Sequence, residues 1–213
     1  MERVVCILIG YLFGLLQTGY LYGKIHGIDI REYGSGNAGT TNALRVLGKK
    51  AGIITYLGDA LKAVFAGIVV ELIFRKSAPE MMPLLVLYSG MGVVLGHNYP
   101  FYLHFKGGKG IAAISGMALA YDWKLALCMM VLFILVVAVT RYVSLGSILM
   151  MLFFLGFLVV KGQLGYYQME QAYLNEVYMV GGLLTILTIE KHRANIGRLL
   201  KGTESKLGEK KTS

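Results

Sequence analysis

The chain has 213 residues, of which 56% are hydrophobic, and it carries a formal net charge of +9. Its mean hydropathy of +0.61 argues against an ordinary soluble domain, because its apolar runs approach the roughly 20 residues that one helix needs to cross a bilayer. The positive charge lies at the ends of these runs without interleaved aromatic residues. This pattern argues against a nucleic acid as partner and favours anionic lipid and phosphate.

Seven apolar runs predict an all-α integral membrane protein with about seven transmembrane helices. The first run is not expected to be a cleaved signal peptide, because no small-residue cleavage site follows it and further spans come after it. Several runs are short and contain glycine, which favours tilted or closely packed helices. The runs cover residues 4–22, 51–74, 81–95, 110–121, 125–139, 145–160 and 177–189.

Basic residues are unequally divided between the two sides of the predicted bundle. With the N-terminus outside, 15 of the 21 lysines and arginines fall on one side, five fall on the other, and Lys62 lies within a span. Since positive residues stay in the cytoplasm, this asymmetry predicts an outside N-terminus, a cytoplasmic C-terminus and an odd number of spans. We expect a single membrane domain over residues 1–201, followed by a basic, flexible cytoplasmic tail at residues 202–213.

The first polar segment, residues 34–50, reads GSGNAGTTNALRVLGKK and has the composition of an anion site. Glycine adopts positive φ without a steric penalty, so the backbone N–H groups of Gly34, Ser35, Gly36 and Asn37 can converge on an anion. A plain turn uses the same small residues, but it rarely has an arginine close by at a bilayer. The side chains that follow and can bind phosphate are Thr41, Asn42 and Arg45.

Asp59 and Lys62 are ionisable residues inside the second apolar run. A charge at the bilayer centre costs about 2.5–3.5 kcal/mol on insertion scales, so such groups pair or line a cavity. The two residues are three positions apart on one helical face, where they can neutralise each other. Mutual structural pairing and a role in lining a substrate cavity both fit this spacing.

The second polar segment, residues 96–110, reads GHNYPFYLHFKGGKG. It lacks the full P-loop pattern and follows no predicted strand, so nucleotide binding is not expected. Two lysines that simply obey the orientation rule would look similar, but two glycines between them favour an anion-binding loop. The candidate residues here are His97, Lys106, Gly107, Gly108 and Lys109.

The third polar segment, residues 190–204, reads EKHRANIGRLLKGTE. His192 and Asn195 are three positions apart and share one face if the last helix continues. A buried structural histidine explains His192 equally well. Arg141 and Ser144, between the fifth and sixth runs, complete the polar set expected to bind substrate on the cytoplasmic side.

Motifs of several other enzyme classes are absent. None of the four histidines has an aspartate five positions on, and no G-x-S-x-G sequence occurs. No aspartate cluster could hold Mg²⁺, so we expect no metal and no cofactor, and the electrophile must arrive already activated. Cys6 and Cys128 lack metal or redox spacing and are expected to be small core residues.

The three polar segments resemble, in order and along essentially the whole chain, the motifs of the PlsY family, the bacterial acyl-phosphate:glycerol-3-phosphate acyltransferases. GSGNAGTTNALR is similar to the first family motif, GHNYPFYLHFKGGKG to the second and HRANIGRLLKGTE to the third. The D-x-x-K pattern of the second span is present as Asp59 and Lys62, with Ala63 where glycine is expected. The resemblance implies a multi-pass enzyme of the bacterial cytoplasmic membrane with its active site facing the cytoplasm.

The resemblance also implies a reaction. The 1-hydroxyl of glycerol 3-phosphate attacks the carbonyl of a fatty acyl phosphate, giving lysophosphatidic acid and inorganic phosphate for phospholipid synthesis. The implied partners are these substrates, membrane lipid and the soluble enzyme that supplies acyl phosphate. His97 and His192 are candidate bases, with the substrate's own phosphate preferred as the proton acceptor. By position, the residues expected to hold substrate phosphate are Ser35, Arg45, a lysine of the second motif, His192 and Asn195.

Three alternatives stay open from the sequence. A phosphate or organic-anion transporter would use similar basic loops, although no repeat between the two halves of the chain supports it. A non-catalytic lipid-binding protein would use the cationic clusters as headgroup contacts. An enzyme of the same kind could also take acyl-CoA as its acyl donor.

Overall fold

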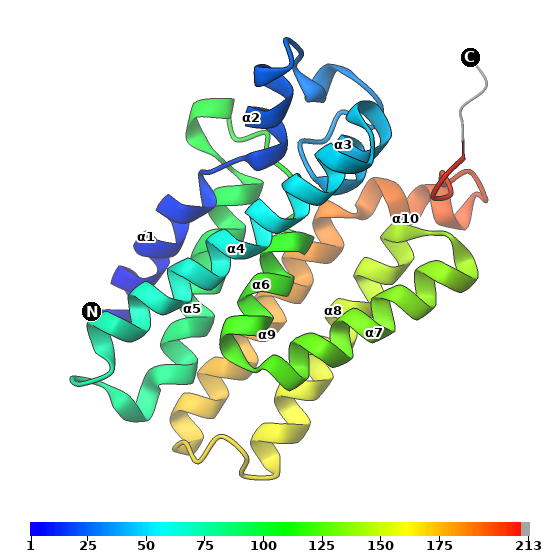
Figure 1. The fold of residues 1–213 in the computed structure, drawn as a ribbon. Helices are drawn as coiled ribbons and strands as arrows, with labels where there is room; N and C mark the ends of the chain where they lie inside the picture. Colours follow the sequence, from blue (N-terminus) through cyan, green and yellow to red (C-terminus); the bar gives the residue numbers. More distant parts are fainter. Residues whose placement is uncertain (210–213) are drawn as a thin grey trace.

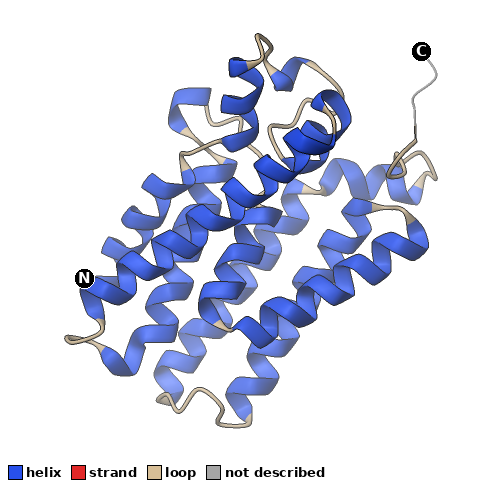
Figure 2. Ribbon diagram, in the orientation of Figure 1, coloured by secondary structure: helices blue, strands red, loops and turns tan. Residues whose placement is uncertain are grey.

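The computed structural model describes residues 1–209, and this part of the chain is helical, without a β-strand (Figure 2). Lys210 and Lys211 of the predicted tail lie outside the described residues. Short 3₁₀ turns, η1 (Ile30–Glu32), η2 (Pro79–Met81) and η3 (Phe101–Leu103), connect some of the helices. The α-helices within residues 1–209 are α1 (Glu2–Gly14), α2 (Thr18–Ile25), α3 (Thr40–Leu47), α4 (Lys49–Phe74), α5 (Met82–Asn98), α6 (Ile111–Tyr121), α7 (Trp123–Thr140), α8 (Val143–Gln163), α9 (Gln171–Lys191) and α10 (Arg193–Leu200).

Each predicted apolar run is α-helical over most of its length, as expected from its composition. The helix α4 has 26 residues and contains Asp59 and Lys62, whereas α6 has 11 and rises only about 16 Å. By length and composition, the described chain has five helical segments that can cross a membrane: Glu2–Ile25, Pro79–Leu103, Trp123–Thr140, Val143–Gln163 and Gln171–Lys191.

The first predicted helix differs from the expectation, because it is interrupted after Gly14 and resumes at Thr18 as α2. A break leaves backbone carbonyls without helical partners, and these must be satisfied by other donors. The ammonium of Lys62 donates to the carbonyls of Gly14 and Leu16. The side-chain amide of Gln17 donates to the carbonyls of Gly14 and His97. The bonds from Lys62 on α4 to the break, and from Gln17 to His97 on α5, can form only once α1, α4 and α5 are packed together.

The helix α5 occupies the centre of the bundle and packs closely on α1. Gly10 and Gly14 of α1 lie against the α5 backbone, and Gly92 and Gly96 of α5 lie against the α1 backbone. A Cβ atom at any of these four positions would overlap main-chain atoms of the neighbouring helix. Small residues four apart allow helices to approach this closely within a membrane, which explains the glycine content of these runs.

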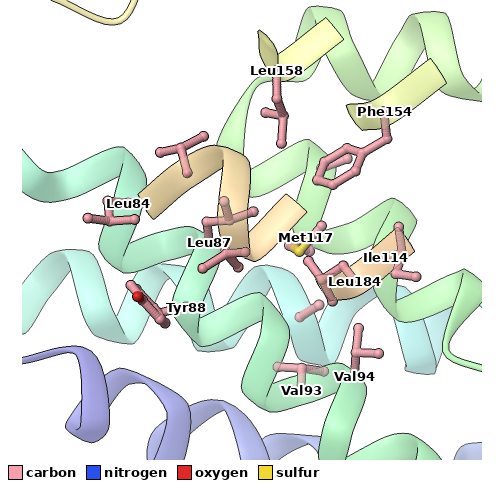
Figure 3. Close-up of a cluster of buried hydrophobic side chains, with 14 of the residues drawn as sticks. Leu84, Leu87, Tyr88, Val93, Val94, Ile114, Met117, Phe154, Leu158 and Leu184 are labelled. Atoms are coloured by element: carbon pink, nitrogen blue, oxygen red, sulfur yellow. The ribbon is translucent and has the colours of Figure 1, made fainter. Parts of the chain in front are cut away.

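The main hydrophobic core lies between α5, α6, α8 and α9 (Figure 3). Cys6 is buried in this core as expected, whereas Cys128 is exposed on α7 and the expectation for it was wrong. A chain that meets lipid can expose small apolar residues on its outer helices, so an apolar run does not by itself identify the core. A smaller cluster beneath α3 consists of Ile30, Ala38, Ala43 and Ala51.

Candidate substrate site

The three polar segments gather at one end of the helical bundle (Figure 1). The loop before α3, the loop between η3 and α6, and the helix α10 lie at this end. The N-terminus and the turns that precede α5, α7 and α9 lie at the opposite end. The prediction that the three segments share one end is therefore in agreement with the fold, and we call this end the site end.

Asp59 and Lys62 form an ion pair inside the bundle, with Nζ 2.9 Å from Oδ1. The hydroxyl of Thr18 also donates to Asp59, over 3.2 Å. The ammonium of Lys62 lies 2.9 Å from Nδ1 of His97. All three ionisable side chains are almost fully buried, with exposed fractions of 1–3%. Their close pairing compensates the cost of burying charge.

The geometry at His97 fixes the role of its two nitrogens. Because a lysine ammonium only donates, Nδ1 accepts and the ring carries its proton on Nε2. The Nε2 edge faces Gly108, where a Cβ atom would overlap the imidazole, and Gly107 lies against the carbonyl of His97. The two glycines thus pack the second polar segment onto the end of α5, and Lys106 is left exposed beside them.

Lys109 points from this loop towards the third polar segment, where its ammonium donates to the side-chain carbonyl of Asn195. Burial lowers the pKa of Lys109 to about 8, opposed by the charge of Glu204. Burial and the charge of Lys109 lower the pKa of His192 to about 4. His192 is therefore neutral near pH 7. Its Nδ1 donates to the carbonyl of Thr188 over 2.8 Å, so its lone pair is on Nε2.

A carboxylate closes the site on this side. Glu204 accepts hydrogen bonds from Ser144 (2.7 Å), Asn195 (2.6 Å) and Arg198 (2.6 Å). Its side chain is 8% exposed although it belongs to the segment predicted as a tail. Sequence reasoning assigned no role to Glu204, and an acidic residue at the end of a basic segment was the available signal.

Arg141 contacts the same C-terminal segment as the one that contains Glu204. Its guanidinium donates to the carbonyl of Leu207, and the Leu207 amide donates to the carbonyl of Arg141. The C-terminal segment is therefore held at Leu207 against the turn between α7 and α8. Of the two site residues predicted at this turn, Ser144 donates a hydrogen bond to the carboxylate of Glu204, and Arg141 donates to a backbone carbonyl.

The first polar segment is anchored by Asn42, which is buried. Its amide nitrogen donates to the carbonyls of Ile30 and Tyr33, and its oxygen accepts from the Ser35 amide. Ser35 is exposed, as are Gly34 and Gly36, which both have positive φ. All the hydrogen-bonding groups of Asn42 serve the loop, which the sequence alone could not reveal.

The remaining predicted residues of this segment lie around the loop. The side chain of Asn37 accepts from the Gly39 amide, and Thr41 is half-buried at the start of α3. Arg45 is exposed on α3, and within residues 1–209 its guanidinium has no carboxylate partner. A guanidinium in this state is available to an anion.

An apolar cavity of about 450 Å³ lies between α1, α2 and α4. Its wall includes exposed side chains such as Ile25 and Phe65, so it opens towards the surrounding lipid. Thr18 and Lys62 are its polar members, and they belong to the buried group around Asp59 and His97. An apolar chain in this cavity would reach the polar site from the side.

No group of three or more histidine, cysteine, aspartate and glutamate side chains able to hold a metal ion occurs among residues 1–209. The donors at the site end are instead ammonium, guanidinium, amide and hydroxyl groups. Such donors are suited to anions with several oxygens, such as phosphate. Fold and site together define a multi-pass helical membrane protein with a candidate anion site beside an apolar cavity.

Comparisons with known proteins agree with this class. The model of the family described as glycerol-3-phosphate acyltransferase matches residues 4–202. A glycerol-3-phosphate acyltransferase of Clostridioides difficile (strain 630) is 43% identical over 98% of this chain and 97% of its own length. One from Thermoanaerobacter sp. (strain X514) is 38% identical over 99% of this chain and 98% of its own.

The fold is also similar to solved structures of PlsY (YgiH), an integral membrane glycerol 3-phosphate acyltransferase. Its glycerol 3-phosphate form is similar to this chain with a TM-score of 0.83 and 34% identity, over 98% of this chain and 96% of the other. Its lysophosphatidic acid form gives a TM-score of 0.81. The chain belongs to the glycerol-3-phosphate acyltransferase (PlsY) family and is a multi-pass membrane acyltransferase.

Proposed function

We propose that this protein transfers a fatty acyl group from acyl phosphate to the 1-hydroxyl of glycerol 3-phosphate. The products are lysophosphatidic acid and inorganic phosphate, in the synthesis of phospholipids. The names of the relatives support glycerol 3-phosphate as the acceptor. The observation that carries the proposal is the junction of an apolar cavity with a cationic loop across Lys62 and His97.

The cavity suits the acyl chain, and the loop suits phosphate. Lys62 belongs to the cavity wall and contacts His97, and His97 in turn packs against Gly108 of the loop. An acyl phosphate is apolar at one end and anionic at the other, so this junction matches its two ends. The acyl carbonyl would then lie between them, close to Thr18 and Lys62.

We assign phosphate binding to the donors that gather at the site end. Arg45 and Lys106 are exposed cations, and the Gly34–Asn37 backbone offers further N–H donors. Their exposure suits the phosphate of a water-soluble acceptor that arrives from one side of the membrane. Side chains that contribute further contacts or shape the pocket in this proposal are Ser35, Thr41, Asn42, Lys109, Arg141, Ser144, His192 and Asn195.

The proposed reaction needs little activation by the protein. The substrate hydroxyl oxygen forms a bond to the acyl carbon, the bond from that carbon to the phosphate oxygen breaks, and phosphate leaves with the electron pair. The hydroxyl proton passes to the substrate's own phosphate. His97 is a poor base because Lys62 occupies its lone pair, whereas neutral His192 is the alternative acceptor. Catalysis then rests on positioning and electrostatic stabilisation.

The same proposal includes the orientation in the membrane. The helices α4 and α6 complete seven spans in one membrane domain, with the N-terminus outside and the site end in the cytoplasm of a bacterial cell. The excess of lysine and arginine on one side supports this orientation. A soluble enzyme that makes acyl phosphate could then deliver it from the cytoplasm.

The test uses protein purified in detergent with glycerol 3-phosphate and either palmitoyl phosphate or palmitoyl-CoA. We expect equal amounts of phosphate and lysophosphatidic acid from palmitoyl phosphate, no product from palmitoyl-CoA, and no loss of rate with EDTA. Turnover with palmitoyl-CoA but not with palmitoyl phosphate would show that acyl-CoA is the acyl donor. Absence of turnover with both donors, in protein shown to be folded, would reject the proposed reaction.

A further inference from the structure

The carboxylate of Glu204 is the acceptor for three donors that come from separate parts of the chain. Ser144 is at the start of α8, Asn195 and Arg198 are on α10, and Glu204 follows α10. Ser144 and Asn195 are themselves buried, with exposed fractions of 5% and 8%. Hydrogen bonds from Asn195 and Ser144 hold the pKa of Glu204 below its ordinary value although burial alone would raise it. The group is therefore an anion near neutral pH.

This anion decides which way the amide of Asn195 points. An ionised carboxylate only accepts hydrogen bonds, so the nitrogen of Asn195 must face Glu204. The oxygen of Asn195 is then directed away from Glu204, and it accepts the hydrogen bond from the ammonium of Lys109. The position of Lys109 thus depends on Glu204 through the amide between them.

We propose that Glu204 is a positioning residue for the ammonium of Lys109, acting through the amide of Asn195 and through its own negative charge. The part of this inference that concerns substrate rests on the proposed function, in which Lys109 binds phosphate. Its geometric part concerns only the protein. A glutamate that merely joined α10 to α8 would still raise the pKa of Lys109 by its charge, but its loss would leave the orientation of the Asn195 amide and the KM unchanged.

The groups around Lys109 predict in which direction its pKa should change when each of them is replaced. Three titratable or charged groups act on it: Glu204 from the C-terminal segment, Arg198 from α10 and neutral His192 from the end of α9. The charge of Glu204 raises the pKa of Lys109, and the charge of Arg198 lowers it. Since the pKa of Lys109 is about 8, the wild-type rate at low substrate should fall as the pH rises through this value.

The main variant is Glu204→Gln, which keeps the size of the side chain but removes its charge. Its amide nitrogen would face the donors of Ser144, Asn195 or Arg198, so the amide of Asn195 can reverse and release Lys109. We expect the KM for the phosphate substrate to rise about tenfold, because one charged acceptor is lost from the network. We also expect the alkaline fall in rate to move to lower pH.

Chemical labelling gives a readout that does not depend on turnover. The rate of acetylation of Lys109 by acetic anhydride, followed across pH by mass spectrometry, reports the deprotonated amine. The midpoint should move to lower pH in Glu204→Gln and to higher pH in Arg198→Gln. The matched control is Glu209→Gln, an exposed glutamate in the same segment, which should leave the midpoint and the KM unchanged.

Folded Glu204→Gln protein with an unchanged Lys109 midpoint would overturn the inference. If that variant does not fold, Glu204→Asp replaces it, because a shorter carboxylate keeps the charge and draws it away from Asn195. A smaller shift in the same direction is then expected, and no shift would again overturn the inference. Wild-type protein without turnover on either donor would reject the proposed function, while the labelling would still test the positioning of Lys109.

Discussion

The two ends of the bundle hold their positive charges in different ways. At the end with the N-terminus, Arg3 donates two hydrogen bonds of 2.6 Å to Glu176. The ammonium of Lys161 lies 2.8 Å from a carboxylate oxygen of Asp122. Each of these cations has a carboxylate partner and contributes to holding neighbouring helices together.

At the site end, three cations of the first two polar segments have no direct carboxylate partner among the described residues. Arg45 and Lys106 are exposed and have no carboxylate partner within residues 1–209. Lys109 is held by the neutral amide of Asn195, with the nearest negative charge one residue further away at Glu204. The number of basic residues therefore predicts only the side of the membrane, whereas the pairing of each cation together with its place in a glycine-rich polar segment selects the candidates for substrate binding.

The largest effect is expected when an unpaired cation is created inside the helical bundle. Asp59→Ala would leave Lys62 buried without its carboxylate, which costs about 3–5 kcal/mol. The expected result is a strong fall in the midpoint of thermal unfolding in detergent. The double variant with Lys62→Met should recover much of this loss. An unchanged midpoint in the single variant would show that Asp59 does not neutralise Lys62.

Lys109→Met should lower kcat/KM about 10- to 100-fold, because a charged hydrogen bond to phosphate is worth about 1.5–3 kcal/mol. The loss should appear mainly in KM, with little change in the midpoint of unfolding. Lys124→Met is the matched control, since Lys124 is exposed at the opposite end and should leave the kinetics unchanged. Equal kinetic losses in both variants would contradict the proposed difference between the two ends.

The sequence predicted where the polar segments lie, because a polar interruption between apolar runs is a local feature. Pairing of Asp59 with Lys62 and a cavity-lining role were both predicted, and both are seen: the two residues form an ion pair, and Lys62 also belongs to the cavity wall. The interruption of the first helix was missed, because it depends on the ammonium of Lys62, which reaches the break from α4 only after packing. Glu204 was missed for the same reason, since Ser144 is 60 residues away in sequence.

Glu176→Gln tests the opposite end and should affect stability alone. The pair with Arg3 is partly exposed, with 31% and 28% of the side chains accessible, so we expect a loss of about 1 kcal/mol. The midpoint of unfolding should fall slightly, and KM should stay unchanged. Glu80→Gln, an exposed glutamate at the same end, serves as control. A change in KM would mean that this end also contributes to substrate binding.

The smallest effect is expected for Arg193→Gln, which removes a cation at the site end without touching the proposed pocket. Arg193 lies 3.4 Å from Glu190, with 83% and 48% of the side chains exposed. Such a pair contributes less than about 1 kcal/mol, so stability and KM should both change little.

Arg193 therefore separates two explanations of anion binding at this end. If individually positioned donors hold phosphate, Arg193→Gln has almost no effect and Lys109→Met has a large one. If the summed field of all cations holds it, the two variants should raise KM to a similar extent. In that case, the rise in KM should also become much smaller in high salt, because exposed charges are screened beyond about 10 Å at 0.1 M ionic strength. The half-buried position of Lys109 against Asn195 favours positioned donors.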